Sequence, residues 1–376
     1  MRIVAARLTP VRLPLERPLV TGHGKIAARE GAVLELEDDS GARGLGEALP
    51  LPGFGLETFA QTETALQEMA RTAVSAPETS LSERLDRAAR EHADAPCARA
   101  AFDVALHDLA ARRDGLPLAS WLAKHAGTTA RVEVAASRLL TSIAADATAA
   151  EARRAVAEGF GTLKLKVGAG AFEADLERVA AVRESVGPDT ALRVDANGAW
   201  SEREALEHIA RLARHGIELL EQPIAAGDPA ALARVREAAP FPIAADESVG
   251  DEAAAEALLA VGAADLFVLK PAALGGLRPC HRIAERARGS GVGVVVTSFL
   301  DSALGVCAAL HLAASLPVER AAAGLATSDH LVHDLAEPPA WRAGSLRVPA
   351  EPGLGCALEP VRLARVATGP TRERRV

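Results

Sequence analysis

Five short apolar segments of this 376-residue chain each end in a charged side chain, and successive charges lie 24–29 residues apart. In order, the charged residues are Lys166, Asp195, Glu221, Asp246 and Lys270. A strand, a helix and two short loops occupy about that much chain, because the crossover between parallel strands is long. The spacing therefore predicts a (β/α) barrel with one charged residue at the carboxyl end of each of these strands, where such barrels build their active sites.

Alternating strand and helix patterns extend from about residue 129 to residue 342. Helices of ordinary length between parallel strands favour a closed α/β barrel of the (β/α)8 type. The alternative is an open doubly wound sheet, but no G-x-G-x-x-G sequence opens a helix after the first strand. We expect the eight strands to begin at Val132, Thr162, Ala191, Ile217, Pro242, Leu266, Gly293 and Ala321.

The two flanks of the barrel have a different pattern. Residues 1–128 begin with strand-like segments and a hairpin signal at residues 38–41, and become helical after about residue 57. Residues 343–376 return to short β-like pieces. We expect an α+β capping domain over residues 1–128 and the barrel over residues 129–342. Residues 343–376 should pack back on the capping domain and end in a frayed tail from Thr371.

Asp195, Glu221 and Asp246 would bring three oxygen donors together on neighbouring strands. Hard oxygen ligands without His or Cys favour magnesium over zinc, with manganese as a substitute. Each acid alone could equally be solvated or pair with Lys164 or Arg193. Three acids at matched strand positions predict a metal site.

Lys164 and Lys166 are two residues apart on one strand, so both side chains point to the same face, which is the interior of a barrel. Two adjacent ammonium groups are costly to bury unless anions lie close. Burial and like charge disfavour the protonated form whereas carboxylates favour it, and the balance allows one lysine to accept a proton. Lys270 lies four strands further on, across the barrel mouth. The arrangement suits removal of a proton next to a substrate carboxylate.

Further residues near the strand ends and in two Gly/Pro-rich loops complete the predicted substrate site. Ser298 and Asp301 follow the seventh strand, where they could bind substrate or orient the second lysine. His23 and Phe54 lie in the two loops, which could close over the site. The predicted substrate-binding residues are Asn197, Ser298, Asp301, His23 and Phe54.

Net charge and the lack of a long apolar run exclude several classes of protein. With 42 basic and 50 acidic side chains, the net charge of −8 disfavours a general binder of nucleic acid or anionic membranes. No segment approaches roughly 18 uninterrupted apolar residues, and the N-terminus lacks a signal-peptide core. The four cysteines show no metal-binding spacing. We expect a cytoplasmic enzyme that acts on a small-molecule carboxylate, with homo-oligomer formation left open.

Together these segments resemble the enolase superfamily, specifically its muconate-lactonizing-enzyme branch. The resemblance implies a modified (β/α)7β barrel under a capping domain, with Asp195, Glu221 and Asp246 as magnesium ligands. It also implies an acid/base pair, Lys166 and Lys270, with Lys164 beside them, working through an enediolate as known for the superfamily. The mandelate-racemase branch is disfavoured, since it carries a His where this chain has Thr297-Ser298. The matching segments are Gly44-Leu-Gly-Glu47, Lys164-Leu-Lys166, Asp195-Ala-Asn197, Glu221-Gln-Pro223, Asp246-Glu-Ser248 and Lys270-Pro271.

Within that branch, residues 47–58 and 297–305 resemble the loops of o-succinylbenzoate synthases of menaquinone biosynthesis. This implies a lyase in which Lys166 removes the α-proton and Lys270 stabilises the enediolate. Dipeptide epimerases of the branch carry an Asp-x-Asp motif at the eighth strand, whereas here Asp329 lies slightly beyond that place. The alternatives are an N-succinylamino-acid racemase, a dipeptide epimerase and a muconate-type cycloisomerase.

A barrel that binds a ligand without catalysis is the alternative from a different class. An inactive relative is expected to have lost at least one of the five strand-end charges, and this chain retains all five. Replacing Lys166 by Ala separates the two classes, because an enzyme should lose turnover while still binding magnesium.

Overall fold

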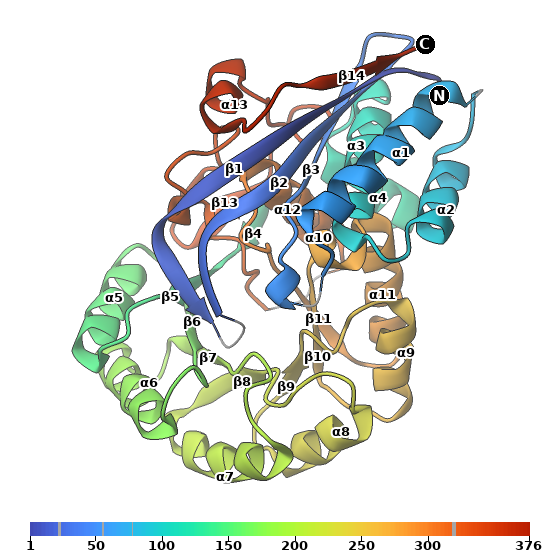
Figure 1. Ribbon diagram of the computed structural model, residues 1–376. Coiled ribbons are helices and arrows are strands. Elements are labelled where there is room, and N and C mark those ends of the chain that lie inside the picture. Colours follow the sequence, from blue (N-terminus) through green and yellow to red (C-terminus); the bar gives the residue numbers. More distant parts are fainter. Residues whose placement is uncertain (22–23, 55, 77, 318–320) are drawn as a thin grey trace.

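The computed structural model describes residues 1–21, 24–54, 56–76, 78–317 and 321–376. A long, curved antiparallel sheet with helices on one face stands above a ring of parallel strands that is itself surrounded by helices (Figure 1). Within the described ranges, no helix is both long and apolar enough to cross a membrane. His23, one of the predicted substrate-binding residues, lies outside the described residues.

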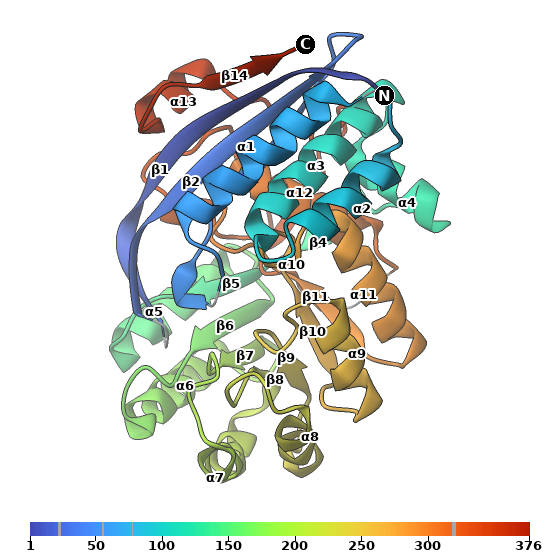
Figure 2. The ribbon, with the colours of Figure 1, turned by 45° about the vertical axis from the view of Figure 1, so that its right-hand side comes forward.

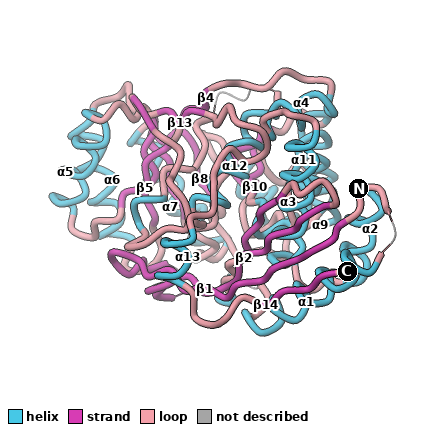
Figure 3. The backbone as a smooth tube through the Cα atoms, turned by 90° about the horizontal axis from the view of Figure 1, so that it is seen from above, coloured by secondary structure: helices cyan, strands magenta, loops and turns pink. Residues whose placement is uncertain are grey.

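The capping domain is built on a four-stranded antiparallel sheet in the order β14-β1-β2-β3. Its strands are β1 (Ile3–Thr21), β2 (Gly24–Asp38), β3 (Arg43–Ala48) and β14 (Arg372–Arg375). The last of these pairs with β1, with Ala5 opposite Arg375, and Figure 3 shows the two side by side. The prediction of a frayed tail is therefore wrong, because the C-terminus satisfies the free backbone groups on the edge of β1.

Helices cover one face of this sheet (Figure 2). They are α1 (Phe59–Ser75), α2 (Leu81–Glu91) and α3 (Pro96–Arg113), followed by α4 (Leu118–Ala126). A capping box between Thr58 and Gln61 starts α1, whose buried face presents Leu66, Met69 and Ala73 to the sheet. The sheet, α1, α2 and α3 bury a core of their own, whereas α4 packs in the core that contains the barrel.

In the part of the chain that the structure describes, the barrel contains seven parallel strands in sequential order, β5 to β11. They are β5 (Ser137–Leu140), β6 (Thr162–Lys166), β7 (Ala191–Asp195), β8 (Ile217–Glu221), β9 (Ile243–Ala245), β10 (Leu266–Leu269) and β11 (Gly293–Val296). The outer helices are α5 (Ala145–Ala157), α6 (Phe172–Val186), α7 (Glu202–Leu212), α8 (Pro229–Ala238), α9 (Glu252–Ala260), α10 (Pro271–Leu274), α11 (Leu277–Gly289) and α12 (Ala303–Ser315). Leu and Val side chains of the strands pack against these helices in one continuous core.

Two residues close the barrel between its first and last strands. Ser137 N of β5 donates to Ala323 O at 2.8 Å, and Gly324 N donates to Val296 O of β11 at 3.0 Å. The eighth strand predicted from Ala321 is thus reduced to a bridge of two residues. The predicted fold class, a modified barrel under an α+β cap made from both ends of the chain, is confirmed.

The first barrel strand also departs from its prediction. The segment predicted to begin at Val132 is divided into β4 (Glu133–Ala135) and β5. Outside the barrel, β4 joins an antiparallel sheet with β13 (Ser345–Arg347) and β12 (Trp341–Arg342). Local alternation could not reveal this division, because the partner strand lies about 200 residues away. The remaining short elements are η1 (Pro52–Phe54), η2 (Ala213–His215), η3 (Ser328–His330) and α13 (Pro360–Val366).

Candidate active site

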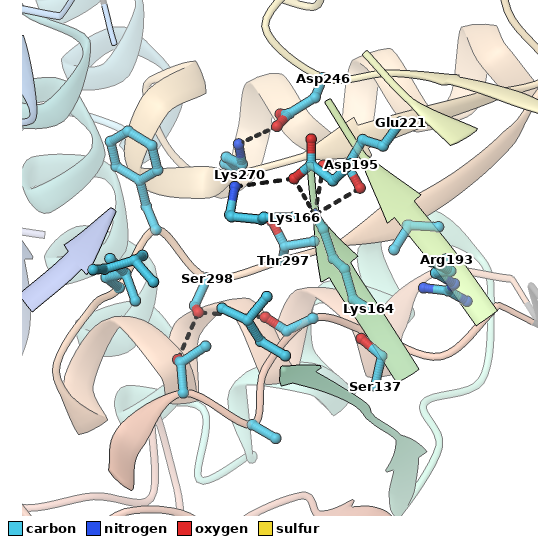
Figure 4. A pocket seen from close by; sticks show the side chains of 18 of the residues that line it. Ser137, Lys164, Lys166, Arg193, Asp195, Glu221, Asp246, Lys270, Thr297 and Ser298 are labelled. Carbon is cyan, nitrogen blue, oxygen red and sulfur yellow. Dashed lines mark hydrogen bonds and ion pairs between the residues drawn. The ribbon is translucent and has the colours of Figure 1, made fainter. Parts of the chain in front are cut away.

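A cavity of about 100 Å³ lies at the carboxyl ends of the barrel strands, beneath the capping domain. The cap contributes apolar side chains, Leu19, Ile26, Leu51 and Phe54. The barrel contributes the predicted strand-end charges together with Lys164. The charged residues lining the cavity are Lys164, Lys166, Arg193, Asp195, Glu221, Asp246 and Lys270 (Figure 4).

The lysines and acids of this cavity are paired in direct contact. Lys164 Nζ lies 2.8 and 2.7 Å from the two carboxylate oxygens of Glu221 and 2.9 Å from Asp195 Oδ2. Lys166 Nζ lies 3.0 Å from the same Asp195 oxygen. Lys270 donates to Asp246. Three ammonium groups therefore balance three buried carboxylates.

The acids respond differently to this environment. Burial opposes ionisation of Asp195, but Lys164 and Lys166 outweigh burial and hold the pKa of that carboxyl below its usual range. Burial and the charge of Asp195 raise the pKa of Glu221 to about 7. Burial also raises the pKa of Asp246, against the opposing charge of Lys270. A further positive charge near Glu221 and Asp246 would favour their ionised forms.

The donor set fits magnesium in its chemistry. Asp195 and Glu221 are the last residues of β7 and β8, and Asp246 directly follows β9, the next strand. All three side chains are buried. The lysine ammonium groups contact the oxygens of these acids, and within the described ranges no three acidic, His or Cys side chains already converge on a common metal position. A divalent cation among these acids would lower the proton affinity of the neighbouring lysines, and a neutral lysine is what a general base requires.

Lys166 and Lys270 approach the cavity from opposite sides. Lys166 ends β6, and Lys270 directly follows β10, four strands away in the sheet order. Asp195 and the Asn197 Oδ1 atom hold the Lys166 ammonium group. Burial works against the charged form of Lys270, but Asp246 and Glu247 outweigh it and raise its pKa. A substrate carbon between these lysines would have one amine on each face.

The other predicted substrate-binding residues occupy different places. Phe54 and Ser298 line the cavity, and Ser298 Oγ lies 2.8 Å from Thr327 Oγ1. Asn197 lines a neighbouring cavity and adopts a left-handed backbone conformation with φ of 45°. Asp301 lines neither cavity; one of its oxygens accepts from Phe299 N at 2.8 Å. The substrate contact or the orienting of Lys270 that the sequence suggested for Asp301 stays a prediction.

Asp301 belongs to a buried polar cluster between the cap and the barrel. Glu47 of β3 accepts from the backbone N–H of Ser302, at 3.0 Å, and from its hydroxyl group. Burial and the adjacent Asp301 raise the pKa of Glu47 to about 8. Arg29 of β2, fully buried, donates to the backbone oxygens of Leu49, Pro50 and Leu300. This cluster connects the capping domain to the loop after β11.

A second cavity of about 600 Å³ opens beside the first and shares Leu19, Lys166 and Leu300 with it. Asp329, the shifted ligand considered from the sequence, lies on the wall of this second cavity. Its carboxylate is 2.6 Å from Arg138 Nη2. Among the described residues 321–330 near the eighth strand, Asp329 is paired with Arg138 and none contributes a carboxylate to the first cavity.

Sequence reasoning did not single out Phe299, Arg193 or Thr327 as lining residues. Phe299 lies in the segment 297–305, whose family resemblance was evident, so its position after a strand was the available signal. Leu19 and Ile26 had no such signal, because they reach the barrel only through the long β1–β2 hairpin (Figure 1).

Comparison with known families covers most of the chain. Residues 3–123 match the family described as mandelate racemase / muconate lactonizing enzyme, N-terminal domain. Residues 147–361 match the family described as enolase C-terminal domain-like. The chain is 34% identical to the L-Lys-D/L-Arg epimerase of Methylococcus capsulatus, over 94% of this chain and 99% of that one. It is 30% identical to muconate cycloisomerase 1 of Pseudomonas putida, over 89% and 90% of the two chains.

Solved structures resemble the whole molecule. The N-succinyl Arg/Lys racemase of Bacillus cereus superposes with a TM-score of 0.92, 25% identity and full coverage of both chains. A dipeptide epimerase of Enterococcus faecalis, complexed with magnesium and the dipeptide L-Leu-L-Tyr, superposes with a TM-score of 0.89 and 29% identity. That match covers 95% of this chain and 100% of the other.

Proposed function

The chain belongs to the mandelate racemase / muconate lactonizing enzyme family of the enolase superfamily, and within this family we propose that it racemises N-acylated amino acids. The reaction class common to the superfamily is magnesium-dependent removal of a proton next to a carboxylate. The observation that carries the proposal is a lysine on either side of one cavity, Lys166 and Lys270. Racemisation needs a base on one face of the α-carbon and an acid on the other.

The acids and lysines have separate roles in this reaction. Asp195, Glu221 and Asp246 would hold magnesium, which when bound offsets the negative charge that develops on the substrate carboxylate. For one enantiomer, neutral Lys166 takes the α-proton and protonated Lys270 donates a proton to the opposite face. The roles reverse for the other enantiomer, so protons balance in both directions. Lys164 contacts both Glu221 and Asp195 and compensates part of their negative charge.

The lining of the cavity favours an uncharged substrate nitrogen. Next to β11 and the closing bridge, the first cavity is lined by neutral groups, Thr297, Ser298, Gly324, Ala326 and Thr327. A free ammonium group of a dipeptide would need an anion there, because burying an unpaired charge is costly. An N-acyl group carries no such charge. The second cavity offers room for the acyl group or the amino-acid side chain.

The second candidate is o-succinylbenzoate synthase, the lyase predicted from the sequence. The apolar part of the first cavity, from Leu19, Ile26, Leu51 and Leu139, suits a carbocyclic acid. Both substrates carry a carboxylate next to an acidic C–H bond and use the same lysines. The lyase differs in expelling hydroxide, so the product separates the two.

The test supplies one substrate of each kind to the purified protein in D2O, with magnesium or with EDTA. The substrates are N-succinyl-L-amino acids, dipeptides and the succinyl-hydroxycyclohexadiene carboxylate. We expect EDTA-sensitive loss of the α-proton signal and a change of optical rotation for the N-succinylamino acids. Lys166→Ala should abolish racemisation. Fast formation of o-succinylbenzoate, without racemisation, would favour the lyase instead, and exchange of dipeptides alone would favour an epimerase.

A further inference from the structure

The two lysines of the site have different surroundings. Lys166 is held by polar partners, Asp195 and Asn197. Lys270 also donates to a carboxylate, Asp246, but in addition lies over an aromatic ring: its Nζ is 5.4 Å from the ring centre of Phe299. In the part of the chain that the structure describes, neither Lys164 nor Lys166 has such a ring beside its ammonium group. The negative face of an aromatic ring attracts an ammonium group and shields it from water.

The backbone around Phe299 is held in an unusual conformation. Leu300 has a φ of 56°, in the left-handed region that residues with a Cβ rarely adopt. Asp301 accepts from Phe299 N at 2.8 Å, and the buried Arg29 donates to Leu300 O at 3.2 Å. Such a conformation persists only where the surroundings impose it. The cap, through Arg29, thus helps to fix the direction of the Phe299 side chain.

The capping domain also contacts the ring itself. Phe54 of η1 meets Phe299 edge-on, with ring centres 5.4 Å apart and planes at 79°. The guanidinium carbon of Arg29 lies 5.5 Å from the same ring centre. Edge-to-face packing of aromatic rings is a favoured arrangement, so Phe54 supports the orientation of Phe299. The chain of contacts runs from the cap through one ring to one lysine.

We propose that Phe299 is a positioning residue that holds the Lys270 ammonium group on its face of the substrate, and that the capping domain sets this ring through Arg29 and Phe54. The capping domain then influences the position of Lys270 and not that of Lys166. Lys166 is positioned by the barrel residues Asp195 and Asn197. The kinetic part of this inference rests on the proposed racemisation; the positioning itself does not. Phe299 acts through Lys270, and no proton passes through the ring.

The first test needs no substrate. The chain has only five lysines, Lys25, Lys124, Lys164, Lys166 and Lys270, so lysine labelled with ¹³C at Cε yields a simple NMR spectrum. The ring current of Phe299 should shift the Lys270 Hε signal upfield. We expect Phe299→Leu to move this signal toward the other lysines and leave Lys166 in place, with a smaller change in Phe54→Leu. An unmoved Lys270 signal in Phe299→Leu would overturn the proposal.

The matched control is Phe241→Leu, since Phe241 is a half-buried ring that precedes β9 at the opposite end of the barrel. This variant should leave the Lys270 signal unchanged. Should it shift Lys270 as much as Phe299→Leu does, the effect would be one of general packing, which also contradicts a positioning role.

The second test measures deuterium uptake at the α-carbon of each enantiomer separately, after Lys166→Ala and Lys270→Ala have assigned each enantiomer to its lysine. Phe299→Leu should slow the Lys270-dependent exchange at least tenfold through kcat, with KM nearly unchanged. Lys166-dependent exchange should change less than twofold, and Phe299→Tyr should restore most of the loss. Equal loss for both enantiomers would contradict the proposal. If the unmodified protein exchanges neither enantiomer, racemisation is refuted, and the NMR result alone decides the role of Phe299.

Discussion

Lys164 donates hydrogen bonds to both carboxylate oxygens of Glu221, at 2.8 and 2.7 Å. Its Nζ also lies 2.9 Å from Asp195. One ammonium group thus compensates two buried acids, and both acids belong to the predicted metal site. Removing this lysine would leave their charges without their shared partner, and a divalent cation could then take its place.

Replacing Lys164 by Ala should destabilise the metal-free protein by about 3–5 kcal/mol, the usual cost of breaking a buried ion pair. Excess magnesium should recover part of the loss, because binding to the folded state stabilises it. Thermal unfolding with and without magnesium chloride would measure both effects. Lys124→Ala, at an exposed position of α4, is the control. A smaller magnesium effect in Lys164→Ala than in the unmodified protein would contradict the metal assignment.

Glu47 predicts a dependence of stability on pH. Burial and Asp301 raise its pKa to about 8 in the folded protein, above the value of about 4.3 expected when unfolded. The folded state therefore binds the Glu47 proton more tightly than the unfolded state does. The contribution of this proton to the free energy of unfolding is complete below about pH 4 and is lost as pH rises to about 8. Glu47→Gln, which mimics the protonated form, should flatten this decline. Melting temperatures from pH 5 to pH 9 would test it, and parallel curves would contradict it.

Asp329 is either a ligand of the substrate or a partner in a structural ion pair, and a substitution separates the two roles. Its carboxylate is bound to Arg138 on the wall of the second cavity and does not line the first. Asp329→Asn should change kcat/KM for N-succinylamino acids less than about fivefold, since an exposed ion pair contributes only about 1 kcal/mol. Steady-state kinetics over several acyl groups and side chains would show this. Loss of activity by orders of magnitude would make Asp329 a ligand of the substrate after all.

Gly46 allows α3 to pack directly on β3. A Cβ added at Gly46 would lie 2.0 Å from Ala101 O, a backbone atom that cannot move alone. Gly46→Ala should therefore lower the free energy of unfolding by about 2–4 kcal/mol, at the upper end of single substitutions. Chemical denaturation measures the loss. Gly161→Ala is the matched control, because a Cβ there meets no atom within 4 Å. Equal effects of both changes would contradict the packing argument.

The sequence by itself was sufficient to predict the barrel and the charged residues at the carboxyl ends of its strands. Strand alternation and the recurrence of Lys166, Asp195, Glu221, Asp246 and Lys270 are local and periodic, so they are visible without knowledge of distant contacts. Because parallel strands end on the same side of a barrel, the spacing alone predicted that these side chains would meet. Their chemical roles remain predictions, as do the domain boundaries.

Only the tertiary structure decided which distant segments touch. It divided the first barrel strand between two sheets, reduced the eighth to Ala323 and Gly324, and paired β14 with β1. It also brought Phe54 of the cap against Phe299, which lies over Lys270. The pairing of β14 with β1 and the contact of Phe54 with Phe299 join residues hundreds of positions apart, and no periodic pattern records such a pairing. They depend on how the whole chain closes on itself, because a side chain's partner is set by packing rather than by its neighbours in sequence.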